Sequence, residues 1–168
     1  TIIRDLELDE IVDILQNLPN QKTENILSAM SQRDRLRIQE ALEYPEDSAG
    51  GLMNTDIISV RPKHNLEVVM RYLRAQRELP KNTDQIFVVS RENKYLGSLP
   101  ISLIVVSDPS LNVRELMETE TQPLEANLND KDVSRLFEQN DWVSAPVVDN
   151  ESRLIGRVTI EDVVDVIM

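Results

Sequence analysis

The sequence predicts a mixed α/β (α+β) fold in which two similar strand–helix repeats follow a set of short helices. The first 43 residues carry apolar side chains at helical spacing, and from Met53 onward the chain repeats itself. The composition agrees, since 168 residues with 40% hydrophobic and 29% charged residues can bury a core without disulfide or metal support.

Residues 1–43 are expected to form a few short helices that belong to a larger helical domain. Leu8, Ile11 and Leu15 fall on one helical face, and Pro19 ends that first helix. Asp9 and Asp13 are spaced four apart and therefore share a face as well. Helices this short cannot enclose a core alone, so they must pack on what precedes or follows them.

Residues 44–52, "YPEDSAGGL", form an acidic segment between the helical part and the repeats. Gly50-Gly51 lacks the spacing and the lysine of a phosphate-binding loop. The pair is therefore interpreted as a flexible joint on which the helical part moves.

The repeats are predicted to span residues 53–112 and 113–168, each with the order strand, capped helix, strand, polar turn, strand, helix. Aligned without a gap, Val88-Val89 falls on Val147-Val148 and Leu96-Gly97 falls on Ile155-Gly156. In the second repeat Asn129 is the expected helix cap, with Asp132 at the reciprocating position. Strands that alternate with helices predict sheets covered by helices on one side.

Charge and composition exclude several classes of function. The net charge of −12 argues against nucleic-acid binding, which needs a basic face. The absence of cysteine excludes disulfides and thiolate metal sites. No apolar run is long enough to span a membrane, although the chain ends inside an apolar helix and is expected to be part of a longer protein.

The duplicated unit resembles the cystathionine-β-synthase (CBS) domain, which occurs as a tandem pair. The match is strongest in "SAPVVDNESRLIGRVTIEDVVDVI", which contains the family's strand–turn–strand and closes on Gly156, Thr159 and Asp162 as Gly-x-x-Thr-x-x-Asp. The resemblance implies a homodimer formed through CBS helix faces. The candidate apolar faces lie in "LEVVMRYL" and "DVSRLF", unless their apolar residues serve the core of the repeat instead.

"YPEDSAGGLM" leading directly into such a pair, with acidic helices before it, is similar to the cytosolic part of the MgtE family of magnesium transporters and channels. The resemblance implies a regulatory region on the cytoplasmic side of the cell membrane that senses Mg²⁺ and controls a transmembrane pore. Mg²⁺ is hard, keeps several waters and needs only one or two carboxylates, so such a site requires no dense motif.

The resemblance implies that Mg²⁺ bridges the helical domain to the CBS pair, and it implies a set of residues that bind the ion. Two like charges about 4 Å apart at a surface-like dielectric repel by about 4 kcal/mol, and a divalent ion reverses that balance. Each acid could equally be a solvated helix residue or a cap. The expected ligands are Asp9, Asp13, the carbonyl of Gly51, Asp162, Asp165 and, at a separate helix end, Glu138 and Asp141. Lys131 departs from the family at that second place and would repel the ion.

Adenine-nucleotide sensing is the alternative, because many CBS pairs bind nucleotides. The expected contacts are Thr159 for phosphate, Asp162 for ribose and Trp142 for the base, although a lone tryptophan usually serves packing. ATP is expected not to bind at the family's position, because Leu103 replaces the acid there. Pro100, Ser102 and Gln85 also depart from the expected residues.

No catalytic constellation is visible, and the chain is expected not to be an enzyme. His64 is the single histidine and lies in the polar turn "RPKHN", with no nucleophile paired to it. The classes that remain are a magnesium-sensing regulatory region, a nucleotide-sensing CBS module and a dimerisation module without a ligand.

Overall fold

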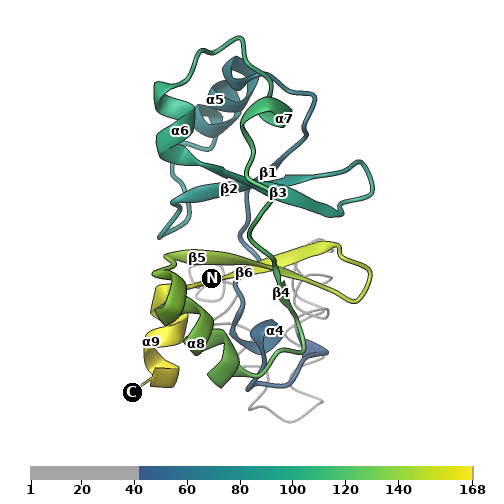
Figure 1. The fold of residues 1–168 in the computed structure, drawn as a ribbon, viewed down its shortest axis with the longest axis vertical. Helices are drawn as coiled ribbons and strands as arrows, with labels where there is room; N and C mark the ends of the chain where they lie inside the picture. Colours follow the sequence, from purple (N-terminus) through teal and green to yellow (C-terminus); the bar gives the residue numbers. More distant parts are fainter. Residues whose placement is uncertain (1–41, 168) are drawn as a thin grey trace, which may run out of the picture.

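The computed structural model describes residues 42–167, and Figure 1 shows two α/β repeats stacked so that their sheets face each other and their helices cover the outer sides. The predicted ligands Asp9 and Asp13, and the expected helices of residues 1–41, lie outside the described residues.

The first repeat contains a three-stranded sheet in the order β1-β2-β3. Its elements are β1 (Ser59–Val60), α5 (Leu66–Ala75), β2 (Gln85–Val89), β3 (Tyr95–Pro100) and α6 (Ile101–Val106). Strand β1 is parallel to β2, and β3 is antiparallel to it.

The second repeat has the same order and register. Its elements are β4 (Leu124–Glu125), α8 (Asp130–Asn140), β5 (Ser144–Val148), β6 (Leu154–Thr159) and α9 (Ile160–Ile167). Val147 pairs with Gly156 as Val88 pairs with Gly97, and each hairpin has an irregularity directly after that pair. The gapless alignment of the two hairpins is therefore confirmed down to individual strand pairs. The first strand and the helix of each repeat correspond at a larger offset, because the connection from α5 to β2 is longer than that from α8 to β5.

The expected helix start at Asn129 is also present. The Asn129 side chain accepts a hydrogen bond from the backbone N–H of Lys131, which satisfies one of the free donors of α8. Asp132 does not complete the predicted reciprocal cap but lies 3.2 Å from the Arg135 guanidinium. Asn65 caps α5 in the same way through the N–H of Val68.

Two short helices that the sequence analysis did not predict lie at the starts of the two repeats. Helix α4 (Ala49–Leu52) packs in the core of the second repeat, and α7 (Val113–Leu116) packs in the core of the first. Ala49 and Val113 are both 0% exposed, so each repeat completes its core with a segment from the other. The two cores are therefore interdependent, although the repeats are separate in sequence.

The expectation of a flexible joint at Gly50-Gly51 is wrong. Both glycines lie in α4, which Ser48 caps by accepting a hydrogen bond from the N–H of Gly51. The N–H groups of Ala49 and Gly50 donate to Leu128 and Ala126 of the second repeat. A side chain at Gly50 would collide with the Tyr44 ring, so this glycine serves close packing instead of flexibility.

Gly97 and Gly156 allow a close approach of the segments that follow α7 and α4, which we call the exchanged segments because each packs on the sheet of the other repeat. A Cβ on Gly156 would lie 2.6 Å from the Met53 sulfur and 2.9 Å from the Asn54 carbonyl oxygen. A Cβ on Gly97 would lie 2.5 Å from the carbonyl oxygen of Glu118, at the equivalent place. The repeated glycine is therefore explained by the backbone that crosses each sheet.

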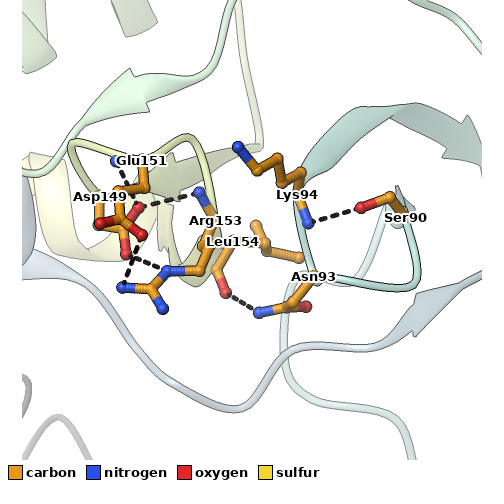
Figure 2. A network of polar contacts seen from close by, with 7 residues as sticks. All are labelled: Ser90, Asn93, Lys94, Asp149, Glu151, Arg153 and Leu154. Carbon is orange, nitrogen blue, oxygen red and sulfur yellow. Dashed lines mark hydrogen bonds and ion pairs between the residues drawn. The ribbon is translucent and has the colours of Figure 1, made fainter.

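The turns of the two β-hairpins join the repeats on one side (Figure 2). The Asn93 amide donates to the carbonyl of Leu154 at 2.9 Å, and the N–H of Leu154 donates back to the Asn93 carbonyl at 3.0 Å. The Tyr95 N–H also donates to the Ser152 carbonyl. These turns therefore fix the angle between the two sheets.

The apolar stripes proposed for dimerisation serve mainly the two cores. Leu66, Val69 and Leu73 of α5 are buried in the first core, and Val133 and Phe137 of α8 are buried in the second. The most exposed apolar side chains of the described residues instead lie at the end of α6. Val105 is 66% exposed and Val106 is 80% exposed.

Candidate functional site: an acidic pocket beside an inter-repeat cleft

The acidic pocket is a cavity of about 610 Å³ between α4, the start of α8 and α9. Carboxylates from three separate segments surround it, with Gly51 on one wall. Its charged residues are Glu46, Asp47, Asp130, Asp162 and Asp165. The structure therefore brings together three of the predicted ligands, Gly51, Asp162 and Asp165, in one cavity.

The segment before α4 enters this pocket because its backbone is held at both ends. The N–H of Asp130 donates to the carbonyl of Asp47 at 2.9 Å, which joins the start of α8 to the acidic segment. Ser48 donates its hydroxyl to the Pro45 carbonyl at 2.6 Å and so closes the turn before the helix. The sequence analysis did not select Asp130, although its position directly after the helix cap Asn129 placed it at the start of α8.

Among the predicted acids that the structure describes, Asp162 is the least solvated, and it caps its own helix. Its Oδ2 accepts hydrogen bonds from the backbone N–H of Thr159 at 2.9 Å and from the Thr159 hydroxyl at 3.1 Å. Burial raises the pKa of Asp162, while the hydrogen bonds from Thr159 and the charge of Arg157 oppose that rise. A cation beside this carboxylate would offset the cost of its burial.

The acids of the pocket are not preassembled into a metal centre. Among residues 42–167, no three acidic or histidine side chains are grouped so that they could jointly hold an ion. Asp165 is exposed and Asp162 is half-buried. The donor set nevertheless fits Mg²⁺, which accepts carboxylate and carbonyl oxygens and retains waters in its other positions.

Glu138 and Asp141 lie away from the acidic pocket, at the opposite end of α8. With a rise of about 1.5 Å per residue, Asp141 is about 16 Å from Asp130 along the helix. Both side chains are exposed. Asp141 ends α8 in the left-handed conformation, with φ of 51°, which aspartate tolerates better than most residues. The left-handed conformation at the end of α8 is therefore sufficient to explain an aspartate at position 141.

The inter-repeat cleft is a second cavity, of about 460 Å³, on the other side of Asp162. Thr159 and Asp162 line it, as the nucleotide alternative requires, together with Arg157. Arg157 is 3% exposed and donates to the backbone carbonyls of Lys81 and Asn82 in the first repeat. The cleft also contains Asp56, Glu78 and Glu161, so its walls have more negative than positive groups and disfavour a polyphosphate.

Trp142 does not join Thr159 and Asp162 in this cleft. It packs edge-to-face on Phe137, with the ring centroids 5.5 Å apart, and belongs to the second core. At the equivalent of the family's ATP position, Leu103 packs against the first core. The Gln85 amide donates to the carbonyl and hydroxyl of Ser144. These residues thus have structural partners of their own.

The fold and the two cavities define a tandem CBS-domain pair. The family model of the CBS domain matches residues 49–105 and 113–168, and the model of the MgtE intracellular N domain matches residues 1–47. The chain therefore belongs to the CBS-domain family, joined to an MgtE N domain, and it is homologous to the MgtE magnesium transporters.

Relatives of known name support this assignment. The chain is 31% identical over 163 residues to the magnesium transporter MgtE of Thermus thermophilus, covering 95% of this chain and 36% of that protein. It is 24% identical over 163 residues to the magnesium transporter MgtE of Bacillus subtilis, covering 97% of this chain and 36% of that protein. The chain thus spans about a third of the length of the curated relatives that it matches.

Solved structures agree with these relatives. The cytosolic domain of the Mg²⁺ channel MgtE in complex with ATP matches with a TM-score of 0.91 and 32% identity, covering 98% of this chain and 68% of that one. The soluble part of a magnesium transporter matches with a TM-score of 0.89 and 25% identity, covering 96% and 63%. Within residues 42–167, no helix has both the length and the apolar content to cross a membrane.

Proposed function

We propose that this chain is the cytosolic, magnesium-sensing region of a membrane magnesium transporter or channel. In this proposal Mg²⁺ bridges the acidic residues of the helical N domain to the CBS pair and favours a compact state that closes the pore. The observation that carries the proposal is the acidic pocket, in which Gly51, Asp162 and Asp165 line one cavity with the carboxylates of Glu46 and Asp47, at the end of the part that matches the N domain.

Repulsion between carboxylates provides the response to the ion. Five acidic side chains line one cavity, and of these five only the Asp162 carboxylate accepts hydrogen bonds among the contacts of residues 42–167. Without a cation these charges oppose any closer approach of a further acidic surface, which Asp9 and Asp13 would supply. With Mg²⁺ bound, that approach becomes favourable, and the population shifts toward the compact state by the difference in ion affinity between the two states.

Movement in this mechanism cannot arise at Gly50-Gly51, because α4 is fixed to the second repeat by its hydrogen bonds. The CBS pair and α4 therefore act as one platform, and the helical N domain is the part that moves relative to it. Helix α9 carries Asp162 and Asp165 and would transmit the change toward a pore domain that follows in the same chain.

The assembly in this proposal is a homodimer formed through the CBS helices. The exposed Val105 and Val106 at the end of α6 form an apolar edge that a second copy could cover. The chain in this role binds and transmits; it catalyses no reaction.

The experiment is solution scattering and thermal unfolding of the chain across a Mg²⁺ titration, starting from protein treated with a chelator. The radius of gyration should fall and the melting temperature should rise with Mg²⁺, and ATP without Mg²⁺ should change neither. Protein that is already compact in chelator, with no change on adding Mg²⁺, would overturn the proposal.

Adenine-nucleotide sensing is the second candidate, favoured by the inter-repeat cleft with Thr159 and Asp162 and by the ATP in the matching MgtE structure. Against it stand the acidic walls of the cleft and the packing of Leu103. The same titration separates the two, since a shift with ATP alone would support this candidate instead.

A further inference from the structure

The basic pocket is a third cavity, of about 420 Å³, between the end of β1, the loop 61–65 and α5. Its polar wall contains Arg61, Lys63 and His64, and its apolar wall contains Val68, Val69 and Tyr72. Cavities of this size hold small organic ligands in other proteins. The pocket shares Tyr72 with the inter-repeat cleft, but it has no residue in common with the acidic pocket.

Its charge is opposite to that of the rest of the chain. The net charge is −12, yet no carboxylate lines this pocket. The acidic pocket and the inter-repeat cleft are each lined by four or more acidic residues. Within the described part of the chain, neither Arg61 nor Lys63 forms an ion pair. Two cations are thus available to a ligand.

The position in the fold also favours an anion. The loop 61–65 leaves the carboxyl end of β1 beside the end of the parallel strand β2 and leads into the N-terminal end of α5, a helix of 10 residues. The helix dipole favours negative charge there. The first N–H groups of α5 already donate to Leu111, Pro109 and Asn65, so the side chains of Arg61 and Lys63 must hold the anion.

The second repeat provides an internal comparison. In both repeats this loop makes the same contact with the exchanged helix: the N–H of Val113 donates to His64, and the N–H of Ala49 donates to Leu128. Sixty-four positions after Arg61 and Lys63 stand Glu125 and Asn127. The fold is therefore built equally well without cations in this loop, so packing does not account for them.

The apolar wall of the basic pocket indicates which chemical group an anionic ligand would carry besides its charge. Val68 is 40% exposed and Tyr72 is 45% exposed, and they are one turn apart on the same face of α5. A tyrosine ring beside a cationic group suits a flat apolar body attached to an anion.

We propose that the basic pocket binds a small phosphate monoester with a flat apolar body. The phosphate lies on Arg61 and Lys63, and the apolar body lies against Val68 and Tyr72. The ligand therefore has two separable parts, each recognised by one wall. This site requires no Mg²⁺ and is independent of the acidic pocket.

The test is an NMR titration of the isotope-labelled chain in chelator with phenyl phosphate, and with inorganic phosphate and phenol as its two halves. Phenyl phosphate should shift the amide signals of residues 59–72 with a Kd near or below about 1 mM, at least about tenfold tighter than either half. Shifts confined to other residues, no shifts, or equal affinity for inorganic phosphate would each overturn the proposal.

Variants separate the site from general charge effects. The double change Arg61→Ser with Lys63→Ser should weaken phenyl phosphate binding at least about tenfold. The control is Arg71→Ser, which removes an exposed arginine of α5 that is paired with Glu67. Tyr72→Ala should reduce the preference for phenyl phosphate over inorganic phosphate. Equal affinity in the double variant and the control would show nonspecific attraction and contradict the proposal.

Discussion

Asp162 accepts two hydrogen bonds from Thr159, one from its backbone N–H at 2.9 Å and one from its hydroxyl at 3.1 Å, both on the same carboxylate oxygen. The same side chain lines the acidic pocket and the inter-repeat cleft. Its hydrogen bonds with Thr159 therefore hold the carboxylate between the two cavities, where the magnesium proposal needs a cation ligand and the nucleotide alternative needs a ribose contact. The two candidate functions consequently compete for one side chain.

The first prediction concerns the response to Mg²⁺. At a Mg²⁺ concentration of about 100 Kd, binding to the folded state alone stabilises it by about 2.7 kcal/mol. Asp162→Asn keeps the shape of the side chain and removes its charge. If the affinity falls tenfold, the stabilisation falls by about 1.4 kcal/mol, or about 4 °C in melting temperature. Differential scanning fluorimetry with and without Mg²⁺ measures this difference.

Glu138→Gln is the matched control, because it removes one exposed carboxylate at the far end of α8. Its Mg²⁺-dependent rise should equal that of the unmodified chain. An undiminished rise in Asp162→Asn would remove this residue from the sensing set. A diminished rise in Glu138→Gln would place a second site at the end of α8.

The second prediction concerns pH in the absence of Mg²⁺. Burial raises the pKa of Asp162 above its unfolded value, despite the hydrogen bonds from Thr159. An acid with a raised folded pKa contributes stability that is complete below its unfolded pKa of about 3.9 and is lost as the pH rises through the folded pKa. Asp162→Asn should therefore gain stability over the unmodified chain between about pH 4 and pH 7.

Urea unfolding in chelator at several pH values measures that gain. Saturating Mg²⁺ at pH 7 provides the internal control, because a bound cation should cancel or reverse the advantage of the neutral side chain. A difference between the two proteins that does not vary with pH would show that the Asp162 carboxylate is not destabilised by its burial.

The strand–helix repeats could be predicted from the sequence because their signals are local. Alternating apolar runs and the cap at Asn129 lie within single elements, and the equivalence of Gly97 and Gly156 indicates that both repeats follow the same pattern. The exchange of α4 and α7 could not be predicted, because each is only four residues long and is stabilised by the opposite core. Short helices depend on tertiary contacts, which local patterns do not contain.

The candidate site could be predicted only in part, and that part came from the family resemblance. The resemblance to the MgtE family placed Gly51, Asp162 and Asp165 in one set, and the structure brings them together. Asp130 was missed because it enters the pocket only through the contact between its N–H and Asp47. The joint at Gly50-Gly51 was misinterpreted because glycine permits both flexibility and close packing, and the contact with Tyr44 and the hydrogen bonds of α4 to the second repeat decide between them.

The third prediction concerns the close approach of Met53 and Asn54 to Gly156 in the sheet of the second repeat. Gly156→Ala places a methyl group 2.9 Å from the Asn54 carbonyl oxygen and 2.6 Å from the Met53 sulfur, so the crossing backbone must shift. Overpacking of this kind destabilises a core by about 1–3 kcal/mol. Urea unfolding should show this loss, and Gly97→Ala should show a similar one because Glu118 lies at the equivalent place.

Asn150→Ala, at the exposed turn of the second hairpin, is the control and should change stability by less than about 0.5 kcal/mol. If Gly156→Ala were as stable as this control, the Met53 side chain and the crossing backbone would have room to move, and the close approach would not explain the repeated glycine.

The fourth prediction concerns the dimer. Val105 and Val106 are 66% and 80% exposed at the end of α6, which is unusual for two adjacent aliphatic residues unless another surface covers them. The double change Val105→Ser with Val106→Ser should weaken self-association without unfolding the repeat, because neither side chain belongs to the first core. Sedimentation equilibrium should show a dimer for the unmodified chain and a shift toward monomer for the variant.

Val68→Ser is the matched control, since it removes an exposed valine of α5, on another helix of the same repeat. Its dimer should dissociate at the concentration at which the unmodified dimer dissociates. If Val68→Ser dissociates the dimer and the α6 variant does not, the dimer forms through α5, and the apolar stripe of that helix serves both the core and the partner. A monomer for the unmodified chain at all concentrations would contradict the homodimer itself.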